Sequence, residues 1–118
     1  MVVDDDASMR SLLAVYLEGL GYETDQAPDG QEALARSLAE EYDLIVCDVK
    51  MPRMDGTEYY QALCAAAPER AERVVFATGV LATDESDAYL RSLPNARLQK
   101  PFRLAALRRV IADGNGQA

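Results

Sequence analysis

Residues 44–56 read LIVCDVKMPRMDG: four apolar residues, an aspartate, and then a loop that contains proline and glycine. So short and unbroken an apolar run is typical of a strand buried on both faces, as the central strands of parallel sheets are. A second run of the same kind, residues 74–77 (VVFA), ends in Thr78 and Gly79. The sequence therefore predicts a parallel sheet with these two segments near its centre.

Amphipathic segments alternate with further short strands along the chain. Apolar residues at steps of three and four predict helices over 9–20, 31–41, 57–67, 84–93 and 104–112. Strands are predicted at 1–3, 22–27 and 97–99. The side chains expected to face the core from the first two helices are Met9, Leu12, Leu13, Tyr16, Leu17, Leu20, Ala33, Leu34, Ser37 and Leu38.

Five strand–helix units in alternation imply a parallel sheet with helices on both faces and right-handed crossovers. The strands at 22–27 and 97–99 mix polar and apolar residues, as edge strands do. The first strand must then be interior. This places the chain in the α/β class, as a flavodoxin-like three-layer sandwich with a five-stranded sheet in the order 2-1-3-4-5.

Length and composition fit one folded domain. The chain has 118 residues, of which 49% are hydrophobic. We expect a domain over 1–113, followed at 114–118 by a tail or the start of a linker. The first strand is short at its start, which suggests a domain taken from a longer chain.

Charge and cysteine content narrow the function classes. A net charge of −8 argues against direct binding of nucleic acid or of anionic lipid. No apolar run approaches the roughly 18 residues of a membrane span. Cys47 and Cys64 lie in apolar stretches and are expected to be reduced core residues, which favours a cytoplasmic location. The chain has no histidine, so catalysis by histidine within it is excluded.

Polar residues follow the carboxyl ends of the predicted strands. Asp4 and Asp5 follow the first strand, Asp48 the third, Thr78 the fourth and Lys100 the fifth. Ligand sites of open α/β sheets lie beyond these ends, so the side chains should converge. Three carboxylates in one crevice repel one another, and a lysine with a hard divalent cation would balance them. Mg²⁺ fits this set of oxygen ligands, Mn²⁺ could substitute for it, and such an ion makes phosphoryl transfer feasible.

Four segments in this order resemble the receiver domains of response regulators in two-component signalling. They are residues 2–6 (VVDDD), 48–56 (DVKMPRMDG), 77–79 (ATG) and 100–102 (KPF), and the resemblance covers essentially the whole chain. The 77–79 segment and the short polar fifth strand look more like receivers of hybrid sensor histidine kinases. The resemblance implies a phosphoacceptor, not an enzyme, which promotes only its own phosphorylation and dephosphorylation.

The resemblance also implies a role for each matching residue. Asp48 would be phosphorylated. The metal would be bound by Asp5, Asp48 and the backbone carbonyl of Lys50, with Asp4 acting mainly through a metal-bound water. Thr78, beside Gly79, would be the switch hydroxyl, and Lys100 would hold a phosphoryl oxygen. The remaining expected positions shape the loops: Pro52, Gly56 through an unusual backbone conformation, and Pro101 through a cis bond to Lys100.

The expected partner is a sensor histidine kinase or a histidine phosphotransfer protein, and a phosphorylation-dependent homodimer is a further expectation. The chain departs from the family at Arg97, where an aromatic residue or histidine usually stands. The usual coupling between the switch threonine, here Thr78, and an aromatic ring therefore does not carry over directly. Lys50 occupies a variable position beside the phosphoryl group.

Alternative interpretations remain for several residues and for the function. Asp6, with Ser8 as rival, and Asp55 are expected to be helix caps, and Tyr59 and Tyr60 to be packing residues. A receiver that only binds partners is the second hypothesis, against which the complete acid, threonine and lysine set argues. A dehalogenase-type phosphatase would need an aspartate where Lys50 stands, and a flavodoxin would not place three aspartates beside its phosphate.

Overall fold

The computed structural model describes residues 1–79, 84–100 and 103–112. Its sheet is parallel and five-stranded, in the order β2-β1-β3-β4-β5. The strands are β1 (Val2–Val3), β2 (Gln26–Ala27), β3 (Ile45–Asp48), β4 (Val74–Thr78) and β5 (Arg97–Gln99). The predicted fold class and strand order are confirmed.

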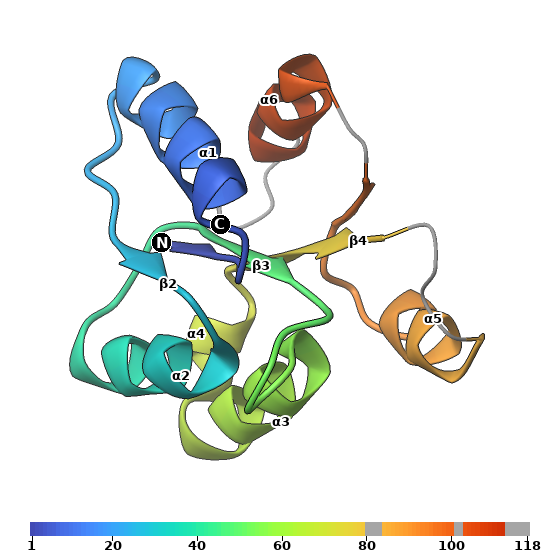
Figure 1. The fold of residues 1–118 in the computed structure, drawn as a ribbon. Coiled ribbons are helices and arrows are strands. Elements are labelled where there is room, and N and C mark those ends of the chain that lie inside the picture. Colours follow the sequence, from blue (N-terminus) through green and yellow to red (C-terminus); the bar gives the residue numbers. More distant parts are fainter. Residues whose placement is uncertain (80–83, 101–102, 113–118) are drawn as a thin grey trace.

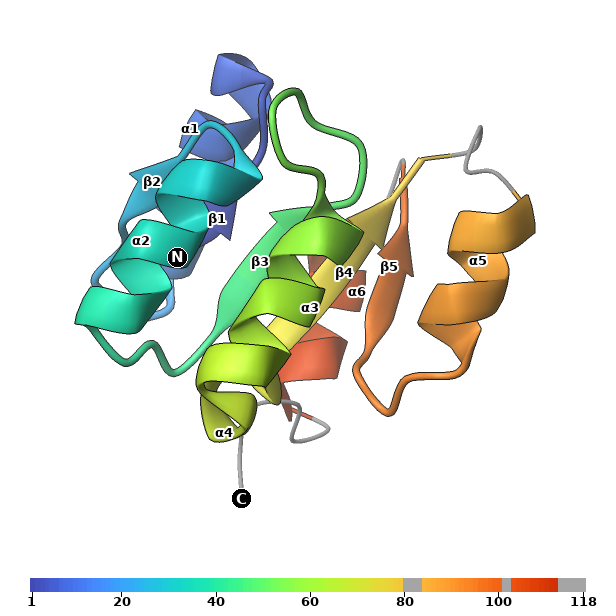
Figure 2. The same ribbon diagram turned by 90° about the horizontal axis from the view of Figure 1, so that it is seen from below.

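Helices cover both faces of this sheet. They are α1 (Ala7–Gly19), α2 (Gly30–Ala39), α3 (Gly56–Ala66), α4 (Pro68–Ala71), α5 (Asp84–Arg91) and α6 (Leu104–Ala112). Figure 1 shows α1 and α6 on one face and α2, α3 and α4 on the other. Seen from below in Figure 2, α5 lies beside β5 at the edge of the sheet. The three layers follow from the right-handed crossovers of consecutive strand–helix units.

The unbroken apolar strands are explained by a core on each side of the sheet. Because side chains alternate along a strand, Ile45 and Cys47 pack toward Tyr59 and Leu63 of α3, while Val46 packs on the other face. That other face is completed by α1 and α6, which contribute Leu13, Leu17 and Leu107. A strand with cores on both sides needs an apolar residue at every position, as residues 44–47 have.

Three predicted core positions are wrong. Leu12, Leu20 and Leu38 are exposed, with 53%, 39% and 48% of their surface accessible. The apolar stripes of α1 and α2 are wider than the surface that the sheet offers them. Leu13, Leu17 and Ala33 face the sheet and pack in the core, whereas the flanking leucines remain exposed to solvent.

Two elements differ from the sequence prediction in extent. The strand expected over 22–27 is limited to Gln26–Ala27, because β1 offers it only two partners, Val2 and Val3. The short helix α4 was not expected; Pro68 begins it, at a position where the missing N–H of proline costs no hydrogen bond.

Buried polar side chains link helices to one another and to the first residue of β4. The hydroxyl groups of Tyr59 and Ser37 are 2.7 Å apart, which links α3 to α2. Tyr60 donates to Asn95 Oδ1 at 3.0 Å, and Asn95 Nδ2 donates to the carbonyls of Ala71 and Val74. Both tyrosines are buried, which confirms their prediction as packing residues.

Candidate functional site

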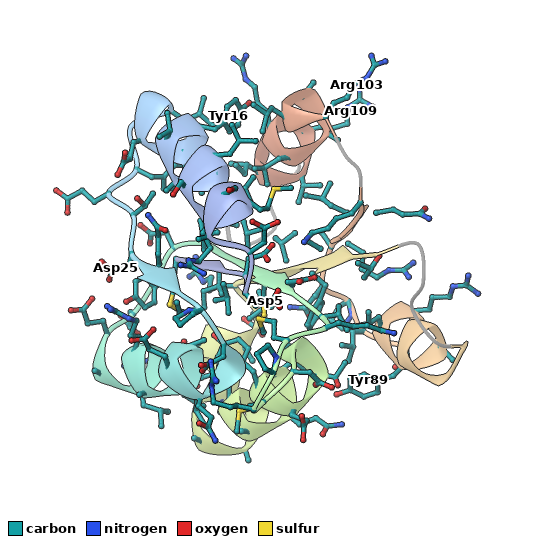
Figure 3. All side chains as sticks on the ribbon, viewed as in Figure 1. Asp5, Tyr16, Asp25, Tyr89, Arg103 and Arg109 are labelled. Atoms are coloured by element: carbon teal, nitrogen blue, oxygen red, sulfur yellow. The ribbon has the colours of Figure 1, made fainter. Side chains whose placement is uncertain are left out.

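An acidic cluster lies where β1 and β3 end. These strands are paired with Val3 opposite Cys47, so Asp4, just after β1, and Asp48, the last residue of β3, lie side by side. One carboxylate oxygen from each of Asp4, Asp5 and Asp48 lies within 4.8 Å of the others. Figure 3 labels Asp5 beside this end of the sheet. Asp4 and Asp48 are buried and Asp5 is exposed, so the cluster opens to solvent through Asp5.

Lys100 completes the cluster from β5. Its Nζ donates to Asp4 Oδ2 at 2.8 Å and lies 3.4 Å from Asp48 Oδ1. The backbone N–H of Lys100 donates to the carbonyl of Thr78, which continues the pairing of β5 with β4 past the end of the strands. Residues 4, 5, 48 and 100 are therefore brought together, as the strand order predicted.

The loop after β1 is held in place around Asp4. Asp4 Oδ1 accepts a hydrogen bond from the N–H of Asp6 at 2.9 Å, and Arg10 Nη1 donates to the Asp4 carbonyl at 2.7 Å. The Asp6 side chain caps α1 by accepting from the N–H groups of Ser8 and Met9. The cap is therefore Asp6, and Ser8 is not. Arg10 was missed by the sequence prediction, although it is the first basic residue after the acidic run.

Burial makes the Asp48 carboxylate costly to ionise. Removal from water raises the pKa of Asp48 to about 6; Lys100 opposes this shift, while Asp4 adds to it. The N–H of Val49 stabilises the carboxylate by donating to Oδ1 at 2.9 Å. For Lys100, burial alone disfavours the ammonium, but hydrogen bonds and attraction from Asp4 and Asp48 outweigh it and raise the lysine pKa. A second cation would favour the ionised carboxylates further.

The loop from Val49 to Asp55 returns tightly against the strand that it leaves. The N–H of Gly56 donates to the Val49 carbonyl at 2.7 Å, and a Cβ at Gly56 would lie 2.3 Å from the Asp48 carbonyl oxygen. The expected reason for Gly56 is thus wrong: its φ is not positive, and what it provides is space. Asp55 caps α3 in a capping box with Glu58, as expected of a cap.

The remaining predicted site residues lie around this centre. Thr78 ends β4, buried, one residue beyond Ala77, which pairs with Asp48. Gly79 and Lys50 are exposed. Pro52 begins the turn that carries Arg53. Pro101, with its expected cis bond, lies outside the described residues. The roles of all these residues stay predictions.

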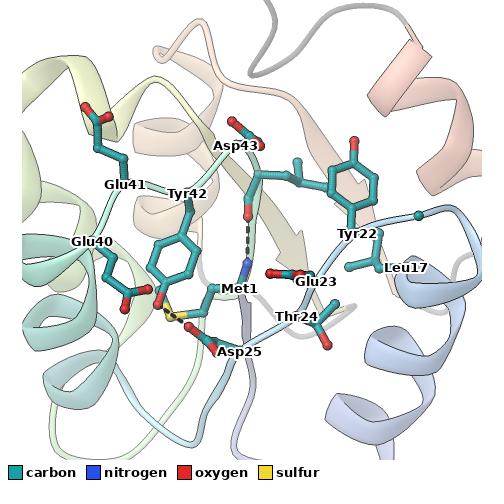
Figure 4. Close-up of a pocket in the computed structure, with 12 residues that line it drawn as sticks. Met1, Leu17, Tyr22, Glu23, Thr24, Asp25, Glu40, Glu41, Tyr42 and Asp43 are labelled. Carbon is teal, nitrogen blue, oxygen red and sulfur yellow. Dashed lines mark hydrogen bonds between the residues drawn. The ribbon is translucent and has the colours of Figure 1, made fainter.

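A pocket also lies at the opposite end of the sheet (Figure 4). The amino group of Met1 donates there to the Leu44 carbonyl at 2.8 Å, and Tyr42 donates to Asp25 Oδ2 at 2.6 Å. Glu23, Glu40, Glu41 and Asp43 add to its lining. None of these residues reaches the Asp4, Asp5 and Asp48 cluster, so this pocket is separate from the candidate site.

Comparison with known proteins identifies the family. The family model of the response regulator receiver domain matches residues 1–112. The chain belongs to the response regulator receiver family. In this family the domain is a phosphoacceptor of two-component signalling, which agrees with the acidic cluster described above.

Relatives of this receiver domain include regulators and sensor kinases. It is 34% identical to the autoinducer 1 sensor kinase/phosphatase LuxN of Vibrio harveyi over 113 residues, which is 96% of this chain and 13% of LuxN. It is 50% identical to the transcriptional regulatory protein ResD of Bacillus subtilis over 58 residues, 49% of this chain and 24% of ResD. The receiver domain thus spans about a quarter or less of these relatives.

Solved structures of receiver domains have the same fold. The receiver domain of NtrX from Brucella abortus matches with a TM-score of 0.82 and 28% identity, covering 95% of this chain and 93% of that one. The receiver domain of Francisella response regulator 1452 matches with a TM-score of 0.79 and 30% identity, covering 94% and 91%. Among the described residues of the receiver domain, no helix is both long and apolar enough to span a membrane.

Proposed function

We propose that this receiver domain accepts a phosphoryl group on Asp48 from a phosphohistidine, with a divalent metal bound beside it. The observation that carries the proposal is the convergence of Asp4, Asp5, Asp48 and Lys100 from three different strands onto one crevice. Three carboxylates held this close repel one another, and one lysine balances only part of their charge, as expected of a site that binds a cation.

The donor set fits Mg²⁺, with Mn²⁺ as a substitute. The cluster offers only oxygen ligands, which hard cations prefer, and no sulfur or imidazole. Both oxygens of Asp4 already accept hydrogen bonds, from Asp6 and Lys100. This favours Asp5 and Asp48 as direct ligands and leaves Asp4 to act through a bound water. The backbone carbonyl of Lys50 is proposed as a third ligand because the family resemblance implies it. When bound, the ion neutralises charge on the phosphoryl group and fixes its orientation.

The protein's own groups account for the rest of the transfer. An oxygen of Asp48 attacks phosphorus; the new O–P bond forms as the P–N bond breaks, and the electron pair leaves with the imidazole of the donor. Lys100 Nζ, 3.4 Å from Asp48 Oδ1, is close enough to pair with a phosphoryl oxygen. The Thr78 hydroxyl, at the end of β4, would donate to a second phosphoryl oxygen. Gly79, which has no side chain, would leave space beside it for the phosphoryl group.

Phosphorylation would bias two conformations of the surface around Thr78, α5 and β5. Arg97 stands in β5 at the position where the family usually has an aromatic residue or histidine, so the readout would involve an arginine side chain instead. Since the chain has no histidine, the donor is another domain or protein, a sensor histidine kinase or a histidine phosphotransfer protein. A phosphorylation-dependent homodimer belongs to the same proposal. The receiver unit is proposed to cover 1–113 and a tail or linker 114–118, a segment outside the described residues.

Intact mass after incubation with acetyl phosphate tests the site. The protein in Mg²⁺ should gain the mass of one phosphoryl group, and a chelator should abolish the gain. Asp48→Asn should not be labelled, whereas Asp43→Asn, which removes an exposed carboxylate at the other end of the sheet, should label normally. Undiminished labelling of Asp48→Asn would refute the assignment. A wild-type protein that gains no mass would instead favour a receiver that only binds partners.

A further inference from the structure

The loop that follows Asp48 contains a strained turn. Arg53 has a φ of 67°, the one positive value among the described non-glycine residues. The N–H of Met54 donates to the carbonyl of Pro52 at 2.8 Å, which closes a three-residue turn around Arg53. With a positive φ at its centre, this is the rarer and strained form of γ-turn. A non-glycine residue in such a conformation is strained and persists only where its surroundings hold it.

Contacts with the start of α2 hold this turn. Arg53 Nε donates to Asp29 Oδ2 at 2.7 Å, and the Met54 carbonyl accepts from the N–H of Gly30 at 3.0 Å. A Cβ at Gly30 would lie 2.4 Å from the Met54 carbonyl oxygen, so the two backbones touch. We call Asp29, Gly30, Arg53 and Met54 the loop clasp.

Asp29 is itself fixed, which makes it a rigid anchor. Its side chain is only 8% exposed, and Oδ1 caps α2 by accepting from the N–H of Glu32 at 2.9 Å. The hydrogen bond from Glu32, followed by the interactions with Arg53, holds the pKa of Asp29 below its usual value. The exposed Arg53 is thus tied to a buried carboxylate that cannot move without breaking a helix cap.

The clasp limits where the middle of the loop can lie. At its start the loop is fixed by β3, and at its end by the close contact of Gly56 with Asp48 and Val49. Lys50 and Met51 lie between this base and the clasped turn. Two fixed ends and a fixed tip leave Lys50 little freedom, and its backbone carbonyl is one of the three metal ligands proposed above.

We propose that Asp29 and Arg53 form a positioning pair, which sets the affinity of the site for its divalent metal by fixing the loop that carries Lys50. This inference rests on the proposed function. Asp29 is not part of the Asp4, Asp5 and Asp48 cluster, so the pair would act on the metal only through the loop. Its loss should therefore weaken Mg²⁺ binding while leaving the rate of labelling at saturating Mg²⁺ nearly unchanged.

The test measures Mg²⁺ binding by calorimetry, which does not depend on phosphoryl transfer. Residues that hydrogen-bond to metal ligands, without binding the metal themselves, change metal affinity about 10–100-fold when mutated. Because this ion pair is half-exposed, we expect a smaller effect, with Arg53→Ala weakening Mg²⁺ binding roughly three- to tenfold. Asp29→Asn keeps an oxygen to cap α2 and should weaken it similarly. Arg53→Lys should restore part of the affinity. Arg36→Ala, which breaks an exposed pair with Asp25 elsewhere on α2, is the matched control.

The double variant decides whether the two residues act together. If they form one pair, Arg53→Ala combined with Asp29→Asn should bind Mg²⁺ about as well as the weaker single variant. Losses that multiply, or an affinity for Arg53→Ala equal to that of wild type, would overturn the inference while leaving the proposed function intact. A wild-type protein that fails to bind Mg²⁺ would overturn both.

Discussion

At position 56 the close approach of the neighbouring backbone, and not an unusual backbone conformation, requires glycine. A Cβ added there would lie 2.3 Å from the Asp48 carbonyl oxygen and 2.9 Å from Val49 Cα. Both atoms belong to the backbone, so no side-chain rotation can relieve the contact. In Gly56→Ala the loop must withdraw from β3 by several tenths of an ångström or more, and the 2.7 Å hydrogen bond from Gly56 N–H to the Val49 carbonyl is lost or lengthened.

The cost can be worked out from these two effects. Overpacking in a well-packed region costs about 1–3 kcal/mol, and a lost hydrogen bond about 1 kcal/mol. The better helix propensity of alanine returns less than about 1 kcal/mol at a first helical position. We therefore expect Gly56→Ala to lower the free energy of unfolding by roughly 2–3 kcal/mol, and the melting temperature by roughly 10 °C.

Urea unfolding followed by circular dichroism measures this change. Gly19→Ala is the matched control, because no atom lies within 4 Å of a Cβ added there, at the last residue of α1. It should be neutral or slightly stabilising. A Gly56→Ala protein as stable as Gly19→Ala would refute the argument that contact with Asp48 and Val49 requires glycine.

Three further predictions concern charge, packing and buried polar groups. Burial raises the pKa of Asp48 to about 6 in the native state, above a value near 3.9 in the unfolded state. Between these pH values the native state binds more protons than the unfolded state, so the metal-free protein should lose stability as the pH rises. Asp48→Asn in chelator should remove this loss and gain roughly 2 kcal/mol at pH 7 in urea unfolding; equal pH slopes for both proteins would contradict the burial argument. Leu13→Ala should cost about 2–4 kcal/mol and Leu12→Ala less than about 0.5 kcal/mol, since one is buried and the other exposed; similar losses in thermal melts would mean that the face of α1 is assigned wrongly. Asn95→Ala leaves the carbonyls of Ala71 and Val74 without their donor and should cost about 2–4 kcal/mol, whereas Asn95→Asp, which cannot donate to them, should not restore stability.

The sheet could be predicted from sequence because strands buried on both faces appear as unbroken apolar runs. Residues 44–47 and 74–77 are apolar throughout and prove to be central, while the mixed strand 97–99 is an edge. The extent of the strand expected over 22–27 could not be predicted in this way. It depends on how many residues of β1 are there to pair with it, which is a property of another segment.

The centre of the candidate site followed from topology alone. Once the order of the strands is known, their carboxyl ends must meet, and Asp4, Asp48 and Lys100 are placed together without any information on side-chain contacts. Periodicity was a poorer guide to Leu12 and Leu38, because it marks an apolar stripe but not the width of the surface that covers it.

Contacts between loops could not be predicted from the pattern of residues in the sequence. Nothing in the spacing of Asp29 and Arg53 indicates that they meet, since the ion pair follows from how two strand-to-helix loops approach each other in space. For the same reason, the prediction that Gly56 needs an unusual φ failed. The residue type was informative, but the backbone atoms that exclude a Cβ become evident only in three dimensions.

A crystal structure of the protein with Mg²⁺ and beryllium fluoride, an analogue of the phosphoryl group, would locate the phosphoryl and metal positions together. We expect the fluoride complex on the Asp48 carboxylate, Mg²⁺ in contact with Asp5, Asp48 and the Lys50 carbonyl, and Lys100 Nζ on a fluorine atom. Beryllium fluoride on another carboxylate, or Mg²⁺ bound away from the Asp4, Asp5 and Asp48 cluster, would contradict this expectation.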